Sequence, residues 1–240
     1  MNNAFKTGAS GLKAHQKRID NIANNIANVQ TTGFKKTDVA FEDLLYTQFD
    51  VNDPSIVQGH GVRVQGTPID FTAGSLMQSN QALDIAIVGD AFFALLDQNG
   101  VSYTRNGSFR ISEENELSYL VNAQGQYVLD RNLNRIVLPK QSDANIDQVL
   151  LLRTIGTFSF ANKNGLIKAD NTRFLATEGS GAVTTLNPGD VELRPFTLEQ
   201  ANVDLGKSMV ELLEGQRSFQ LNARVVQTAD QIEEIVNNLR

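Results

Sequence analysis

Residues 5–29 read FKTGASGLKAHQKRIDNIANNIANV, and this stretch decides what the rest of the chain must do. Every third or fourth residue along it belongs to one series. The series is Phe5, Gly8, Leu12, His15, Ile19, Ile22, Ile26 and Val29. Its rhythm matches the a and d positions of a coiled-coil seam. Because such a seam is not stable alone in water, the helix predicted here needs a partner.

The C-terminal end of the chain carries the same rhythm. The series there is Leu205, Met209, Leu212, Gln216, Phe219, Ala223 and Val226. After a phase break near Thr228 it continues through Ala229, Ile232, Val236 and Leu239. We therefore expect the two terminal helices to pair with each other or with the ends of neighbouring copies, as in a protein built to assemble.

The middle of the chain consists of short apolar runs separated by turn residues. Strands are predicted at 84–88, 91–97, 101–105, 108–112, 116–121, 126–130, 136–138, 149–153, 156–160, 166–168 and 174–176. The turn residues at 98–100 and the Asn106-Gly107 pair predict hairpins, because Asn-Gly favours the positive φ values of a two-residue turn. Strands at intervals of about ten residues indicate a sandwich or barrel-like domain.

The expected fold is a mainly β central domain plus an α-helical coiled-coil stalk formed by the N- and C-terminal helices. Its expected divisions are an N-terminal coiled-coil helix at 1–34, an extended or β linker region at 35–75, a β-rich central domain at 76–199 and a C-terminal coiled-coil helix at 200–240. No run of about 18 apolar residues is present, so we expect no membrane insertion. The N-terminus lacks the apolar region of a conventional cleaved secretory signal.

Charge is distributed unevenly along the chain. Residues 1–36 carry six Lys or Arg against one Asp, or +5, and residues 200–240 carry four against six, or −2, within a chain of net charge −6. A basic end can indicate nucleic-acid binding, but no aromatic interleaving or known reader motif accompanies it. We therefore expect the basic helix to pack against the acidic one, and we expect no nucleic-acid partner.

Residues suited to catalysis or metal binding are few. The chain has no cysteine and two histidines, His15 in the N-terminal seam and His60 in a loop. A zinc site needs three or four ligands, and neither histidine has another nearby in sequence. No nucleophile elbow, phosphate-binding glycine loop or zinc-protease motif is present. We predict no enzyme, no cofactor and no metal, with Asp84, Asp90 and Asp97 left as candidates for sugar hydrolysis.

Asparagines crowd the end of the first predicted helix. They are Asn21, Asn24, Asn25 and Asn28. Asparagine is a mediocre helix former, and its amide suits a tightly packed polar contact, so we expect these side chains to lie between subunits. Gly33 is predicted to follow the helix in the left-handed conformation, with Phe34 reaching back to Val29 in a Schellman cap.

This N-terminal segment resembles the N-terminal motif of the bacterial flagellar rod and hook family. The matching residues are 21–29 and 32–35 at this end, 201–205, 216–223 and 228–230 at the other end, and 83–87, 89–93 and 103–109 in the interior. The resemblance thus spans nearly the whole chain in order. Residues 41–46 are similar to distal-rod subunits, and residues 70–76 are equally similar to hook subunits.

The resemblance implies an axial protein of the flagellum that polymerises helically into a hollow tube. The terminal helices of such proteins form the inner wall and their β domains lie outside. They pass unfolded through the flagellar type III export apparatus, without a cleaved signal, to the basal body in the cell envelope. Free subunits tend to keep disordered ends that fold on assembly.

We therefore predict a structural subunit of the flagellar rod, of distal type, which transmits torque from motor to hook. Its expected partners are further copies of itself, other rod proteins, the hook protein, surrounding ring proteins and the export apparatus. The residues expected at its contacts are Leu12, Ile19, Ile22, Asn24, Asn25, Ile26, Asn28, Val29, Gly33, Phe34, Asn202, Leu205, Met209, Leu212, Phe219, Asn222, Ala223 and Val226. The alternatives are a hook or hook-junction subunit, an envelope-associated hydrolase and a monomeric binding module.

Overall fold

The computed structural model describes residues 3–48, 57–98, 100–114, 117–138, 148–170 and 172–239. Its internal contacts divide the chain into two compact units. The helical unit comprises residues 1–27, 37–70 and 204–240, and the β unit comprises residues 28–36 and 71–203. N- and C-terminal helices with a central, mainly β region are what the sequence predicts.

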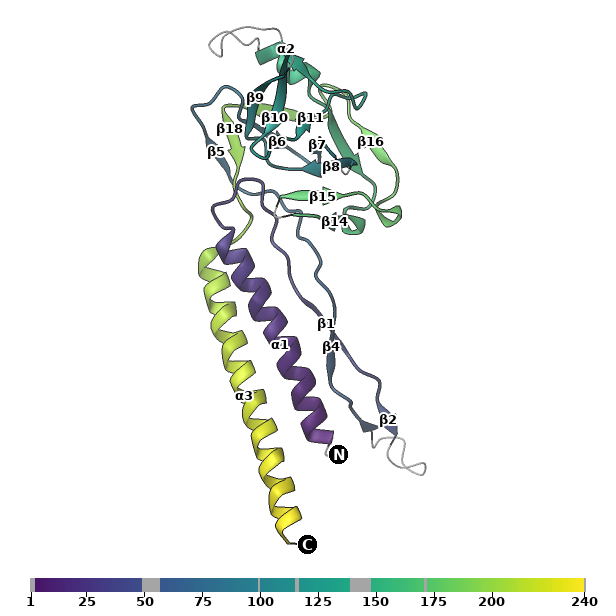
Figure 1. The fold of residues 1–240 in the computed structure, drawn as a ribbon, viewed down its shortest axis with the longest axis vertical. Helices are drawn as coiled ribbons and strands as arrows, with labels where there is room; N and C mark the ends of the chain where they lie inside the picture. The colour runs from purple at the N-terminus through teal and green to yellow at the C-terminus, as the bar shows by residue number, and fades with distance from the viewer. Residues whose placement is uncertain are drawn as a thin grey trace. The chain divides into compact units, whose positions relative to one another are not determined.

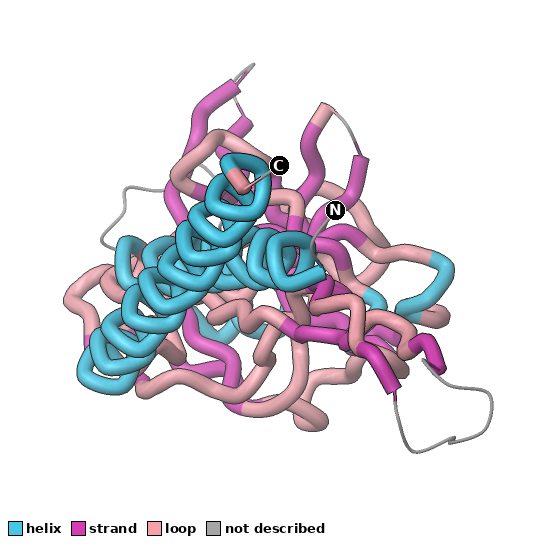
Figure 2. Tube along the Cα trace, turned by 90° about the horizontal axis from the view of Figure 1, so that it is seen from below, coloured by secondary structure: helices cyan, strands magenta, loops and turns pink. Residues whose placement is uncertain are grey.

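Two antiparallel helices dominate the helical unit, α1 (Asn3–Ala27) and α3 (Leu205–Asn238). They lie side by side along α1 (Figures 1 and 2). Asp204 is the N-cap of α3, because its carboxylate accepts a hydrogen bond from the backbone N–H of Lys207 at 3.0 Å. None of the described helices is both long and apolar enough to cross a membrane.

A β arm completes the helical unit. Strand β1 (Ala40–Asp43) pairs antiparallel with β4 (Val62–Gly66), and β2 (Thr47–Gln48) pairs with β3 (Val57–Gln58). The arm runs beside α1 in Figure 1, and β4 contacts that helix directly. Helix α1 is therefore covered on two sides, by α3 and by β4.

The first helix ends earlier than predicted. It stops at Ala27, and residues 28–33 form turns in which the carbonyl of Asn28 accepts a hydrogen bond from the N–H of Thr31 at 3.0 Å. Asparagine favours such local turns over helix, so the crowded asparagines end the helix. Gly33 does adopt positive φ, at 68°, but six residues beyond the helix, and its N–H bonds to the carbonyl of Glu199 at 2.8 Å. The predicted Schellman cap is wrong.

The β unit is built on a ten-stranded sheet. The main path runs β12-β10-β11-β7-β8-β15-β14, with β9 paired to β10, and β13 paired to both β7 and β16. Two further ladders pair β17 with β6 and β18 with β5. The strands are β5 (Leu76–Gln78), β6 (Ile85–Val88), β7 (Phe92–Asp97), β8 (Gly100–Thr104), β9 (Phe109–Glu114), β10 (Leu117–Asn122), β11 (Tyr127–Val128), β12 (Val137–Leu138), β13 (Thr157–Phe160), β14 (Ile167–Lys168), β15 (Arg173–Leu175), β16 (Val183–Thr185), β17 (Glu192–Pro195) and β18 (Thr197–Glu199). Short helices are α2 (Gln148–Thr154), η2 (Lys163–Gly165) and η3 (Glu178–Ser180).

Strand β7 lies at the centre of the core because both of its faces are buried. Phe93 and Leu95 point into one aliphatic cluster, whose other members are Ile85, Ile87, Ala91, Phe109, Leu120, Val128, Ile136, Leu151 and Ile155. Phe92 contacts an aromatic group on the opposite face, with ring centroids 5.5 Å from Phe71 and 5.6 Å from Phe160. A continuous apolar run with two buried faces explains why this strand organises the unit.

Two sequence predictions for the β unit are wrong. The stretch predicted as a strand at 149–153 is α2, in which Leu151 is buried. Ile155, one turn later and just beyond the end of the helix, is buried as well. That four-residue spacing favours a helix. Asn106-Gly107 does not form a hairpin, since β8 pairs with β7 and β15 whereas β9 pairs with β10. Gly107 instead permits close backbone approach, because an added Cβ would stand 1.7 Å from the carbonyl oxygen of Ile85.

Candidate assembly site

Small residues allow α1 and α3 to approach closely. A Cβ added to Gly8 would stand 2.9 Å from Val226, and one added to Gly215 would stand 3.2 Å from Ile19. Gly11 lies against Asn222 in the same way, at 3.1 Å. Gly215 and Asn222 belong to a series of small or polar residues of α3 that recurs every seven positions. The series is Ser208, Gly215, Asn222 and Ala229, of which three are buried and Asn222 is half-buried.

This small-residue series was missed by reasoning from the sequence, which followed larger apolar side chains. Ile22 is buried, and most other predicted contact residues of the two helices are half-buried in the single chain. These are Leu12, Ile19, Ile26, Val29, Leu212, Phe219, Asn222, Ala223 and Val226. Leu205 and Met209 are exposed, at 41% and 50%. The seven-residue recurrence of Ser, Gly, Asn and Ala was the signal that would have placed α3 correctly.

Many apolar side chains along α3 are exposed in the single chain. They are Leu205, Met209, Val210, Leu213, Leu221, Ile232, Ile235, Val236 and Leu239, together with Val225, which lies beside Gly8 of α1. Helix α3 has 34 residues against 25 in α1, so it is nine residues longer. Because Gly8 faces Val226, the excess lies at the C-terminal end, where Ile235 is 59% exposed. An exposed apolar surface of this extent marks an interaction site.

Two of the crowded asparagines hold a neighbouring segment of the same chain. Asn25 is buried, and its amide both donates to the carbonyl of Thr37 at 2.7 Å and accepts from the N–H of Thr37 at 3.1 Å. Asn21 donates to the hydroxyl of Thr37 at 2.8 Å. Asn24 lies on the exposed side of α1, and Asn28 is buried in the turn that follows. Of the four asparagines predicted to lie between subunits, Asn24 is the one that is exposed.

A buried ion cluster lies in the β unit and joins distant parts of the sequence. Lys35 Nζ lies 2.6 Å from Glu199 Oε1, with both side chains almost fully buried. Arg105, equally buried, places Nη1 3.5 Å from Glu199 Oε2. Burial lowers the pKa of Arg105, while Glu199 and Asp90 raise it. At the cluster's outer side, Asp90 is 72% exposed and pairs with Lys163 at 2.6 Å.

Sequence reasoning did not identify this cluster. Its three buried members stand at residues 35, 105 and 199, too far apart for any local spacing to connect them. The one local signal is that Lys35 directly follows Phe34, which is fully buried. Gly33 also lies against this region, because a Cβ on it would stand 2.4 Å from the backbone N of Asn106.

Asn202 joins two other segments of the β unit. Its Oδ1 accepts a hydrogen bond from the N–H of Lys36 at 2.7 Å, and its Nδ2 donates to the hydroxyl of Thr72 at 3.1 Å. Predicted from the sequence as an assembly residue, Asn202 thus makes internal contacts in the described structure.

The two histidines lie apart from any metal-binding group. Within the part of the chain that the structure describes, no three His, Cys, Asp or Glu residues are placed to hold a metal ion. His15 packs 6.1 Å from the ring of Phe41, and burial, aided by the charge of Arg18, lowers the pKa of His15. His60 makes a hydrogen bond with the hydroxyl of Thr47.

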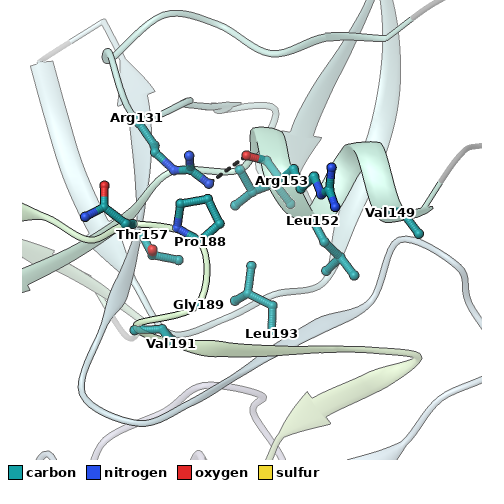
Figure 3. Close-up of a pocket in the computed structure, with 11 residues that line it drawn as sticks. Arg131, Val149, Leu152, Arg153, Thr157, Pro188, Gly189, Val191 and Leu193 are labelled. Atoms are coloured by element: carbon teal, nitrogen blue, oxygen red, sulfur yellow. Dashed lines mark hydrogen bonds between the residues drawn. The ribbon is translucent and has the colours of Figure 1, made fainter.

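The three carboxylates considered for hydrolysis have separate partners. Asp84 is buried and accepts a hydrogen bond from Ser79, whereas Asp97 pairs with Arg173 at 3.2 Å. A pocket of about 240 Å³ lies beside α2 (Figure 3), and neither these two nor Asp90 lines it. Its lining residues are Arg131, Val149, Leu152, Arg153, Ile155, Thr157, Asn187, Pro188, Gly189, Val191 and Leu193. Each of the three carboxylates therefore has different partners.

Three family models match successive parts of the chain. They are "Flagella basal body rod protein" at residues 5–35, "Flagellar hook protein FlgE/F/G D1 domain" at 86–169 and "Flagellar basal body rod FlgEFG protein C-terminal" at 195–239. The first covers nearly all of α1, and the third covers α3. The matches therefore fall on the same regions as the two terminal helices and the β unit.

Curated relatives match over the whole length. Flagellar basal-body rod protein FlgG of Borreliella burgdorferi is 34% identical, with 100% of this chain and 99% of that protein aligned. FlgG of Bacillus subtilis is 31% identical over 99% of both chains, and the hook-basal body complex protein FlhP of the same species is 28% identical over 100% of both. The chain therefore belongs to the family of flagellar basal-body rod proteins.

Proposed function

We propose that this chain is a structural subunit of the bacterial flagellar basal-body rod, polymerising helically into the hollow drive shaft that transmits torque from motor to hook. The observation that carries the proposal is the number of apolar side chains that α3 leaves exposed in the single chain. In a single chain these side chains are exposed to water. Neighbouring copies packed along the helices would cover them. Relatives named as rod proteins over their full length support this role.

The wall of the shaft is formed, in this proposal, by coiled-coil contacts between the terminal helices of neighbouring copies. Leu205 and Met209 suit such contacts because they are half exposed in the single chain. Asn24 suits a polar contact beside them. The β unit then adds lateral contacts outside the wall. A structural role of this kind requires no catalysis. It agrees with the finding that Asp84, Asp90 and Asp97 each have partners of their own.

The partners proposed beyond further copies are other rod proteins, the hook protein and the surrounding ring proteins. In this proposal the chain reaches the cell envelope unfolded, through the flagellar export apparatus. Among rod subunits the distal type is favoured, because several relatives that align over nearly the full length are FlgG proteins. The alternative within the family is a hook or hook-junction subunit.

Electron cryotomography of cells lacking the gene tests the proposal. A basal body with a truncated rod and no hook is the expected result, and the height of the truncation identifies the rod member. A complete rod without a hook would assign the protein to the hook. Intact rotating flagella, in a strain with no second gene of this family, would contradict the structural role altogether.

A further inference from the structure

Three segments of the β unit meet next to the points where the chain crosses into the helical unit. The chain crosses between the two units at 27/28, 36/37, 70/71 and 203/204. The segments of the β unit beside the last three crossings are 33–36, 71–75 and 199–202, here called the junction. Each of these three segments leads directly into the helical unit, and the fourth covalent connection, at 27/28, lies outside the junction.

Every pair of junction segments is connected by hydrogen bonds. Lys35 Nζ donates to the carbonyl of Thr72 at 2.6 Å and to Glu199 Oε1 at 2.6 Å. The same carboxylate oxygen accepts from the N–H of Gly74 at 2.9 Å. Glu199 therefore bonds to both other segments with one oxygen, while its own carbonyl accepts from Gly33.

Asn202 makes a second connection of the same kind. It accepts from the N–H of Lys36 and donates to Thr72, so its amide also spans all three segments. The ladder between β18 and β5 continues past Glu199, because the N–H of Gln200 bonds to the carbonyl of Ser75 at 2.8 Å. The three segments thus form a closed triangle of contacts.

We propose that Glu199 and Asn202 hold the three junction segments together as one mechanical unit. Force on any one of these three segments is then shared with the other two. The buried position of Lys35 and Glu199 favours this role, since water cannot replace hydrogen bonds from which it is excluded. The load itself rests on the proposed function as a torque-carrying subunit. The coupling among the segments is a property of the chain alone.

Hydrogen exchange of the full chain, followed by mass spectrometry, measures this coupling. Glu199→Gln leaves Lys35 buried without its carboxylate partner and leaves Arg105 with Asp90 alone, at 3.9 Å. Exchange is expected to rise about a hundredfold in all three segments together. The matched control is Glu192→Gln, whose carboxylate pairs with Arg194 at the surface and whose loss leaves the junction unchanged. A rise confined to residues 199–202, with wild-type protection in 71–75, would overturn the proposal.

Asn202→Ala covers the case in which Glu199→Gln unfolds the whole β unit. It removes hydrogen bonds without leaving a buried charge, so β7 and β10 keep their protection. Exchange at 36 and at 72 is expected to rise together by about tenfold. A change at only one of these two positions would show that the segments are independent.

Swimming under load tests the mechanical part separately. Cells carrying Asn202→Ala are expected to lose speed more steeply than wild type as the viscosity of the medium is raised. An equal loss of swimming speed in both strains would overturn the proposed sharing of force among the segments. Normal swimming of a strain lacking the gene would instead refute the rod assignment, leaving the exchange result as the test of coupling.

Discussion

Gly33 combines two demands that only glycine meets. Its φ of 68° lies in the left-handed region, and a Cβ would stand 2.4 Å from the backbone N of Asn106. Gly33→Ala is therefore expected to destabilise the β unit by about 3 kcal/mol or more. The added methyl group would strain the backbone at residue 33 and clash with the backbone of Asn106, and neither backbone can move without further cost. The free energy of unfolding, measured in urea, checks this value.

Gly125 provides the matched control for that prediction. Its φ is 81°, but an added Cβ has nothing within 4 Å. Gly125→Ala thus carries the backbone strain without the clash, and it should cost about 1 kcal/mol. Equal losses for the two variants would show that the contact with Asn106 contributes nothing.

His15 makes the helical unit sensitive to pH. Burial lowers the pKa of His15 below its ordinary 6.5, and Arg18 lowers it further. As pH falls below 6.5, the unfolded chain takes up a proton that the folded chain resists, so stability is lost in acid and retained above this pH. Urea unfolding followed by helical circular dichroism at pH 7.5 and 5.5 should show a smaller acid loss in His15→Gln. The same loss in both proteins would contradict the role of His15.

Gly33 and the Lys35–Glu199 ion pair differ in how far the sequence could predict them. The left-handed conformation of Gly33 was predictable from the local run Thr31–Phe34, because turn chemistry is local. The ion pair of Lys35 and Glu199 was not, because it joins residues 164 positions apart. Only the fold brings them together, and no spacing rule applies over that distance.

Among the elements, helix α3 makes close contact with α1 through glycine. Gly215 is buried with a would-be Cβ 3.2 Å from Ile19. Gly215→Leu is expected to force the helices apart, at a cost of about 1–3 kcal/mol, and to reduce swimming. Gly206→Leu is the control in the same helix, since its Cβ meets only Asp204 at 3.5 Å and leucine favours helix.

A second-site change shows whether that contact is direct. Ile19→Ala in the Gly215→Leu background makes room for the added side chain, so swimming should recover in part. Recovery with an unrelated small substitution elsewhere in α1, but not with Ile19→Ala, would place the clash at another residue.

Element type was predictable wherever one period was clear along the sequence. The two terminal helices and most strands of the central sheet follow from it. The wrong predictions of helices and strands fall where tertiary contacts determine the structure. Helix α2 was taken for a strand because the run VLLL at 149–152 has no polar residue to reveal its period. Strands β1, β4, β5, β17 and β18 form pairs with strands distant in sequence. The predicted seam of α3 followed the bulky residues and missed the small ones, whereas the contact with α1 uses both, with Gly215 against Ile19 and Val226 against Gly8.

The two units of the molecule differ in how much apolar surface each of them buries by itself. The β unit encloses two groups of large side chains around β7, so it has a core of its own. The helical unit instead brings its helices together at Gly8, Gly11 and Gly215, and it leaves many larger apolar residues of α3 exposed. Such a unit gains most of its apolar burial only when further copies are added.

The exposed C-terminal part of α3 gives the sharpest test of this division. Ile235 is 59% exposed, so Ile235→Asp should leave the stability of the purified chain within about 0.5 kcal/mol of wild type. In the assembled rod the same carboxylate would be buried without a partner, which costs several kcal/mol at every copy, so rods should fail to form. Asn238→Asp adds the same charge at one turn's distance and should assemble. Purified basal bodies viewed by electron microscopy separate the outcomes, and normal rods from Ile235→Asp would mean that this side of α3 faces solvent in the polymer.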